Sequence, residues 1–138
     1  MSEMAIDHPA VGERVVYKTF PPITRHTLAL YCGASGDHNP IHVDIDFAKA
    51  AGFPDVFSHG MLVMGYLGQA LTDAVAPGRI RSFSTRFAAI TQLGARLTCE
   101  GHVTEVIECK GERQAKLALT AKDEKGEVKL AGEAIFAL

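Results

Sequence analysis

An acid and a histidine lie close together in the segment SGDHNPIH, residues 35–42. Pro40 stands between Asp37 and His42 and prevents a helix from continuing through them, so the chain must turn there. A turn can bring both side chains to one point, where a carboxylate and an imidazole can bind a water molecule and activate it by general acid–base catalysis. Asn39 could orient this pair by hydrogen bonding.

The same segment also suits an ordinary turn, because Ser, Gly, Asp, Asn and Pro each favour turns for steric or hydrogen-bonding reasons. From the loop alone, the structural and the chemical interpretation both stay open. No metal site is expected. His38 and His42 have the i, i+4 spacing of paired ligands on a helix, but Pro40 removes the helix that would make this spacing useful.

A second candidate group, His59-Gly60-Met61, lies at the start of a long apolar segment. The first N–H groups of a helix have no partner within the helix and carry the positive end of its dipole. Gly60 has no side chain to block a ligand, so its N–H could hold the negative oxygen that develops on a thioester carbonyl. The alternative is that Gly60 only permits close packing.

Further candidates for substrate binding surround these two groups. Ser35 flanks the acid–base loop, and His59 and Met61 flank Gly60, although the side chain of His59 would more simply cap or pack. Arg86 could contact a phosphate of a bound substrate, although strands often carry solvated arginines.

The apolar segment SHGMLVMGYLGQALTDAVAPG, residues 58–78, predicts one long helix with Ser58 as its N-cap. Its residues are apolar on nearly every face, and it is too short to span a bilayer, so the rest of the protein should wrap around it. The remainder of the first half predicts a short strand over 14–20 and short helices over 27–31 and 47–51.

The second half of the chain alternates polar and apolar residues, which predicts strands over 79–87, 96–106, 114–123 and 127–138. Lys110-Gly111 and Lys125-Gly126 stand where hairpin turns are needed. With the strand over 14–20, this describes an α+β architecture in which an antiparallel sheet of about five strands wraps around one long buried helix. A chain of 138 residues is most simply one domain, residues 1–138.

Composition narrows the class of protein. The net charge of −2 and the lack of a Lys/Arg cluster do not suggest a nucleic-acid-binding protein. The three cysteines lack CxxC spacing, so neither a disulfide framework nor a zinc site is expected, and free thiols fit a reducing compartment. No basic segment followed by an apolar run marks a secretory signal at the N-terminus. We therefore expect a cytoplasmic protein without a membrane span.

These residues resemble a known family. Tyr31, Ser35-Gly36-Asp37, Asn39-Pro40-Ile41-His42 and Ala48 resemble the signature of the MaoC-like (R)-specific enoyl-CoA hydratases and 3-hydroxyacyl-thioester dehydratases. His59-Gly60-Met61-Leu62 resembles the second conserved block of that family, and the order of elements is similar to its hot-dog fold. Ala34 departs from the signature, which usually has Leu, Val, Ile or Gly at that position.

The resemblance implies an enzyme, a hydro-lyase that reversibly adds water to trans-2-enoyl thioesters and gives (R)-3-hydroxyacyl thioesters. It implies that Asp37 and His42 are the catalytic pair, that the Gly60 N–H binds the thioester oxygen, and that Asn39 supports the pair. It implies no metal or redox cofactor, because CoA or acyl carrier protein enters as part of the substrate.

The resemblance also implies a homodimer, or a heterodimer with a related hot-dog subunit that lacks the catalytic pair. Two alternative functions stay open at this point. One is a non-catalytic acyl-thioester-binding or partner subunit of a heteromeric dehydratase, and the other is a hot-dog thioesterase.

Overall fold

The computed structural model describes residues 6–138, so the first five residues, part of the segment used to argue against a secretory signal, lie outside the described region. The elements follow in this order: β1 (Arg14–Thr19), α2 (Arg25–Ser35), η1 (Pro40–His42), α3 (Ile45–Ala50), α4 (Gly60–Ala74), η2 (Pro77–Arg79), β2 (Ile80–Phe87), β3 (Thr98–Cys109), β4 (Glu112–Lys122) and β5 (Val128–Ala137). The predicted α+β architecture is confirmed.

One antiparallel sheet contains all five strands in the spatial order β1-β3-β4-β5-β2. β3 and β4 form a hairpin at Lys110-Gly111, where both residues have positive φ (52° and 82°). This conformation is typical of a tight hairpin turn, which is why a glycine is required there. The second predicted turn, at Lys125-Gly126, joins β4 to β5.

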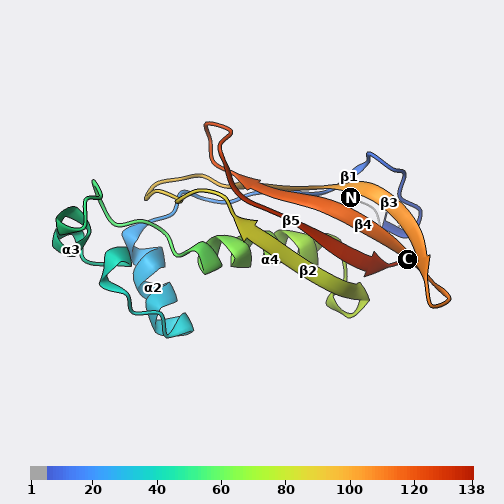
Figure 1. The fold of residues 1–138 in the computed structure, drawn as a ribbon, viewed down its shortest axis with the longest axis horizontal. Helices are drawn as coiled ribbons and strands as arrows, with labels where there is room; N and C mark the ends of the chain where they lie inside the picture. Colours follow the sequence, from blue (N-terminus) through green and yellow to red (C-terminus); the bar gives the residue numbers. More distant parts are fainter. Residues whose placement is uncertain (1–5) are drawn as a thin grey trace.

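The helix α4 lies along one face of the sheet, as Figure 1 shows. Its buried residues, Leu62, Val63, Leu67, Ala70 and Leu71, pack into the same core as the inward-facing residues of the strands. The apolar sequence of α4 predicted that protein would surround the helix on nearly all sides. Within a single chain, the sheet covers only one face of the helix. Met61, at the start of the helix, is 54% exposed.

The start of α4 corrects one prediction. The N-cap is His59 rather than Ser58. The Ser58 hydroxyl instead donates to the backbone oxygen of His59 at 3.0 Å. Ser58 therefore fixes the strand-like segment before the helix, and Gly60 becomes the first helical residue.

Two glycines of α4 lie directly beneath aromatic side chains of β2. A Cβ placed on Gly60 would come within 2.8 Å of the Phe87 ring, and one on Gly68 within 3.5 Å of the Phe83 ring. The short distance explains the glycine at position 60, whereas 3.5 Å is an ordinary van der Waals contact, so a Cβ would fit at position 68. A Cβ on Gly65 would meet no other atom of residues 6–138 within 4 Å beyond the neighbouring helix backbone, so packing among these residues does not require a glycine there.

The helices α2 and α3 project beyond one end of the sheet (Figure 1). Thr24 caps α2 by accepting a hydrogen bond from the Thr27 N–H at 3.1 Å. Gly36 ends this helix in the left-handed region with φ 76°, which a glycine adopts at little steric cost. The loop that follows begins with Asp37. No helix within residues 6–138 has the length and apolarity needed to cross a membrane.

Candidate active site

Local hydrogen bonds shape the loop that follows α2. The Ser35 hydroxyl donates to the backbone oxygen of Tyr31 at 2.7 Å and accepts from the Asp37 N–H at 3.1 Å. The Asp37 carboxylate in turn accepts from the Asn39 N–H at 3.2 Å. Ser35 thus stabilises the turn at the end of α2. Its hydroxyl donates one hydrogen bond and accepts another within the backbone of this turn.

Asn39 begins the next turn. Its side-chain oxygen accepts from the Ile41 N–H at 3.1 Å, and Pro40 occupies the first position of η1. Asn39 therefore shapes the backbone that carries His42 and contacts the backbone of the loop. The residues that form the turn thus also bring the side chains of Asp37 and His42 close together.

Three titratable side chains meet at this point. One oxygen of Asp37 and one ring nitrogen each of His42 and His59 lie within 4.8 Å of one another. A water molecule that makes two hydrogen bonds of about 2.8 Å at a tetrahedral angle bridges groups about 4.6 Å apart. The spacing between Asp37 and His42 thus allows both side chains to bind one water molecule.

The orientation of His42 follows from a single hydrogen bond. Its Nδ1 lies 2.7 Å from the backbone oxygen of Phe57. A carbonyl oxygen can only accept, so Nδ1 carries the proton in this contact. In the neutral imidazole the other nitrogen, Nε2, is then unprotonated and can act as a base.

His59 lies behind His42, and the two rings stack with centroids 3.7 Å apart. The Nε2 of His59 lies 3.4 Å from the backbone oxygen of Asp37 and 3.5 Å from the Cys32 sulfur. Burial lowers the pKa of His59, and the neighbouring His42 lowers it further, while the contacts with Asp37 oppose this change. The surroundings of His59 therefore favour its neutral form.

Asp37, His42 and His59 have the composition of a metal site, but their geometry argues against this use. Ligand lone pairs must converge on a metal ion, whereas two stacked imidazole rings direct their lone pairs along nearly parallel planes, here 26° apart.

A cavity of about 330 Å³ opens beside His42. Gly60 is one of its lining residues, and its walls are mainly apolar, with Val63, Phe87, Ile90 and Leu130 also lining it. The N-cap His59 makes no side-chain hydrogen bond to α4 within the described residues. Because Gly60 is the first residue of α4 and lines the cavity, the positive end of the helix dipole lies there.

The predicted site residues fall into two groups. His42 and Gly60 line the cavity, and Asp37 and His59 lie next to His42. A second group does not line it and comprises Ser35, Asn39, Met61 and Arg86.

Four further residues of the site carry no signal in the sequence. The Phe57 carbonyl orients His42, Cys32 contacts His59, Phe87 covers Gly60, and Lys129 lines the cavity. Each acts through the backbone or through a contact made only in the folded chain.

Comparison with known proteins agrees with the architecture. The protein-family description "MaoC like domain" matches residues 8–125. The unliganded R-hydratase PhaJ1 of Pseudomonas aeruginosa superposes with a TM-score of 0.82 at 28% identity, covering 93% of this chain and 81% of that one. The fold is therefore the hot-dog fold, and the chain belongs to the MaoC-like domain family.

Sequence relatives include the (R)-specific enoyl-CoA hydratase of Rhodospirillum rubrum. It is 32% identical over 114 residues, which cover 81% of this chain and 77% of that protein. The peroxisomal enoyl-CoA hydratase 2 of Arabidopsis thaliana is 36% identical over 80 residues, or 56% of this chain. The chain spans 26% of that plant protein and 4% of the fatty acid synthase beta subunit of Aspergillus oryzae.

Proposed function

We propose that this protein catalyses the reversible hydration of trans-2-enoyl thioesters to (R)-3-hydroxyacyl thioesters. The observation that carries this proposal is the position of Asp37 and His42, whose polar atoms lie within 4.8 Å of one another, with His42 lining an apolar cavity. Membership of the MaoC-like family and similarity to enzymes named enoyl-CoA hydratases support the same reaction.

In the forward direction, Asp37 and His42 hold one water molecule. The Nε2 of His42 accepts a proton from this water while the hydroxyl oxygen bonds to the β-carbon. The π electrons move toward the thioester carbonyl, and the proton on His42 is then transferred to the α-carbon. Both new bonds form on the face nearest the pair, which gives a syn addition that balances as one water added.

The negative charge that develops on the thioester oxygen needs a hydrogen-bond donor. The backbone N–H of Gly60 meets this need, because it is the first residue of α4 and lies at the cavity. Removing one such donor from an enzyme typically costs roughly 10²–10³ in kcat. Asn39 supports this arrangement by holding the turn that carries His42.

The reaction requires no metal or redox cofactor of the protein, since CoA or acyl carrier protein brings the acyl group. The three cysteines are free thiols, which suits a reducing compartment such as the cytoplasm. We propose that the enzyme acts there.

We further propose that the active form contains two hot-dog subunits. The outer edge of β2 is unpaired within the described residues, and unpaired edges favour association. Near this edge, Phe87 is 56%, Met61 54% and Ile90 42% exposed. A solved assembly of similar fold, the ChsH1-ChsH2 complex of Mycobacterium tuberculosis, contains two different chains. Sedimentation of the purified protein would distinguish a homodimer from a monomer that needs a partner.

The test of the activity uses crotonyl-CoA and purified protein. Loss of the conjugated enoyl absorbance and formation of the (R)-3-hydroxy product would support hydration. Release of free CoA thiol would instead indicate a thioesterase. Binding without either change, together with turnover only after addition of a related subunit, would indicate a partner subunit.

A further inference from the structure

A buried lysine lies in the cavity wall and takes no part in the chemistry proposed above. Lys129, in β5, is 4% exposed and lines the same cavity as His42. A buried ammonium group is costly unless it is paired and hydrogen-bonded. Its partners therefore indicate what the residue does.

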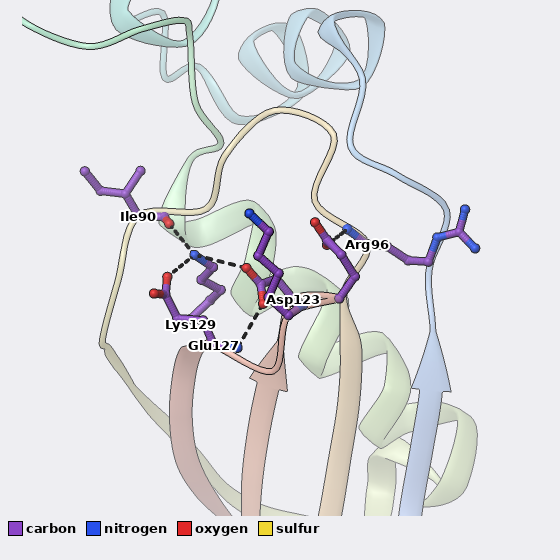
Figure 2. A network of polar contacts seen from close by, with 7 residues as sticks. Ile90, Arg96, Asp123, Glu127 and Lys129 are labelled. Carbon is purple, nitrogen blue, oxygen red and sulfur yellow. Dashed lines mark hydrogen bonds and ion pairs between the residues drawn. The ribbon is translucent and has the colours of Figure 1, made fainter.

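The ammonium group has three partners, which Figure 2 shows. It donates to the backbone oxygen of Ile90 at 2.9 Å, contacts the carboxylate of Glu127, and lies 3.6 Å from the carboxylate of Asp123. An ammonium group has three N–H donors. Two hydrogen bonds and one ion pair thus surround the ammonium group with protein acceptors, so Lys129 is not arranged to bind an anionic group of a substrate.

The turn between β4 and β5 holds the carboxylate of Asp123 in place. Asp123 accepts hydrogen bonds from the N–H groups of Lys125 and Glu127 at 3.0 and 2.9 Å. The neighbouring Glu124 accepts from the Arg96 N–H at 2.9 Å, which attaches the turn to the chain before β3 (Figure 2). The turn therefore fixes Asp123 independently of Lys129, whereas the Glu127 carboxylate contacts the lysine from a largely exposed position.

Lys129 also holds the cavity wall through its backbone. Its carbonyl oxygen accepts from the N–H groups of Ala88 and Ala89, at 2.9 and 3.4 Å. Together with the bond to Ile90, three successive residues of the segment 88–90 are attached to this one lysine. The segment has no regular secondary structure of its own, so these bonds define its course.

The wall segment connects directly to the catalytic side of the cavity. The backbone oxygen of Thr91 accepts from the Ser58 N–H at 2.9 Å, and Phe57 forms an isolated β-bridge with Gln92. The carbonyl of Phe57 is the group that accepts the Nδ1 proton of His42. A displaced wall would therefore move the acceptor that orients His42.

We propose that Lys129 is a positioning residue that anchors the segment 88–91 and, through Ser58 and Phe57, sets the orientation of the His42 imidazole. Its effect on turnover rests on the proposed hydratase function, whereas its effect on Phe57 and Ser58 does not. The two parts can thus be tested separately.

The test is the variant Lys129→Met, which keeps the unbranched apolar part of the side chain and removes the ammonium group. In NMR spectra of the folded protein, we expect the Ser58 amide to exchange with solvent about tenfold faster or more, relative to amides of the central strand β4. We also expect the His42 Nδ1–H resonance to shift or disappear. With crotonyl-CoA, kcat/KM should fall by roughly 10- to 100-fold.

Lys116→Met is the matched control, because Lys116 forms an ion pair with Glu133 at 2.9 Å on the sheet and does not line the cavity. It should leave all three readouts unchanged. Unchanged Ser58 and His42 signals in folded Lys129→Met, or equal acceleration of every amide, would overturn the proposal.

If Lys129→Met does not fold, Glu127→Gln takes its place, since the Glu127 side chain is 60% exposed and its loss threatens the fold less. It should shift the same two signals in the same direction, and no shift would overturn the proposal. If the wild type shows no turnover, the proposed function fails, while the exchange measurement still decides the role of Lys129.

Discussion

The imidazole rings of His42 and His59 stack with centroids 3.7 Å apart and planes 26° from parallel. Two charged imidazoles cannot easily share this arrangement, because like charges at short distance disfavour each other. His59 is 2% exposed, and burial, then His42, lowers its pKa. Protonation of His59 should therefore oppose its burial and its stacking on His42.

This relationship predicts a loss of stability in mild acid. The pKa of His59 in the folded protein lies below its ordinary value of 6.5, so the unfolded state binds more protons as the pH falls below that value. The free energy of unfolding should then decrease with falling pH until the pH passes the pKa of the folded state. Urea denaturation at several pH values between about 7.5 and 5.5 measures this dependence.

The matched variants for this measurement are His59→Asn and His38→Asn. His59→Asn should flatten the pH dependence, whereas His38→Asn should leave it unchanged because His38 is exposed. Equal slopes for wild type and His59→Asn would show that the stacked pair does not carry the effect.

Gly60 offers a prediction about the cavity. A methyl group at this position would lie 2.8 Å from the Phe87 ring, so Gly60→Ala should push Phe87 and lower kcat/KM by about tenfold or more. Gly65→Ala on the same helix is the control. It has open space in the chain, and it should stabilise the protein by about 0.5–1 kcal/mol with activity retained.

A second change would test the cause of the Gly60 effect. If the clash with Phe87 is responsible, the double variant Gly60→Ala with Phe87→Ala should recover part of the lost activity. Full activity in the single variant Gly60→Ala would contradict the assigned position of this glycine at the reacting thioester.

Gly132 in β5 is predicted to be essential for the attachment of β2. A Cβ there would lie 2.1 Å from the backbone oxygen of Ser84, and a backbone atom cannot move aside without breaking the ladder. Gly132→Ala should therefore destabilise the protein by about 3 kcal/mol or more, as measured by chemical denaturation. Gly33→Ala, which meets nothing within 4 Å, should not. Equal stability of the two variants would contradict the β2–β5 packing.

The cysteines should differ sharply in reactivity. Cys109 is exposed, whereas Cys32 and Cys99 are buried, and burial raises the pKa of the Cys99 thiol to about 12. Because the thiolate is the reactive form, a thiol reagent at about pH 8 should label one site quickly. Cys109→Ser should remove this fast phase, and unfolding should expose the other two thiols. Three fast thiols in the folded protein would contradict the burial.

Much of this architecture could be predicted from the sequence. The alternating strands and the two Lys-Gly turns are local patterns, and Pro40 fixes the turn that brings Asp37 and His42 together. The stacking of His59 on His42 could not be predicted, because it joins residues from separate elements. The N-cap of α4 was misplaced by one residue, since Ser58 bonds to the backbone of His59 instead of to the helix.

The Phe57 carbonyl and Lys129 were missed for a related reason. A backbone oxygen has the same identity at every position, so its role in orienting His42 appears only once the chain is folded. Lys129 lies in a strand with the usual alternation of polar and apolar residues. Its role depends on a hydrogen bond to Ile90, which is 39 residues away in the chain. Contacts of this range leave no local pattern.

The most direct test of the central claim is turnover of crotonyl-CoA by the wild type and by Asp37→Asn, with the chirality of the product determined. The asparagine oxygen can still accept the Asn39 N–H, so the loop should stay folded. We predict an (R)-3-hydroxy thioester from the wild type and a loss of roughly 10²–10⁴ in rate for the variant. A folded Asp37→Asn protein with full turnover would contradict the assignment of Asp37 and His42 as the catalytic pair.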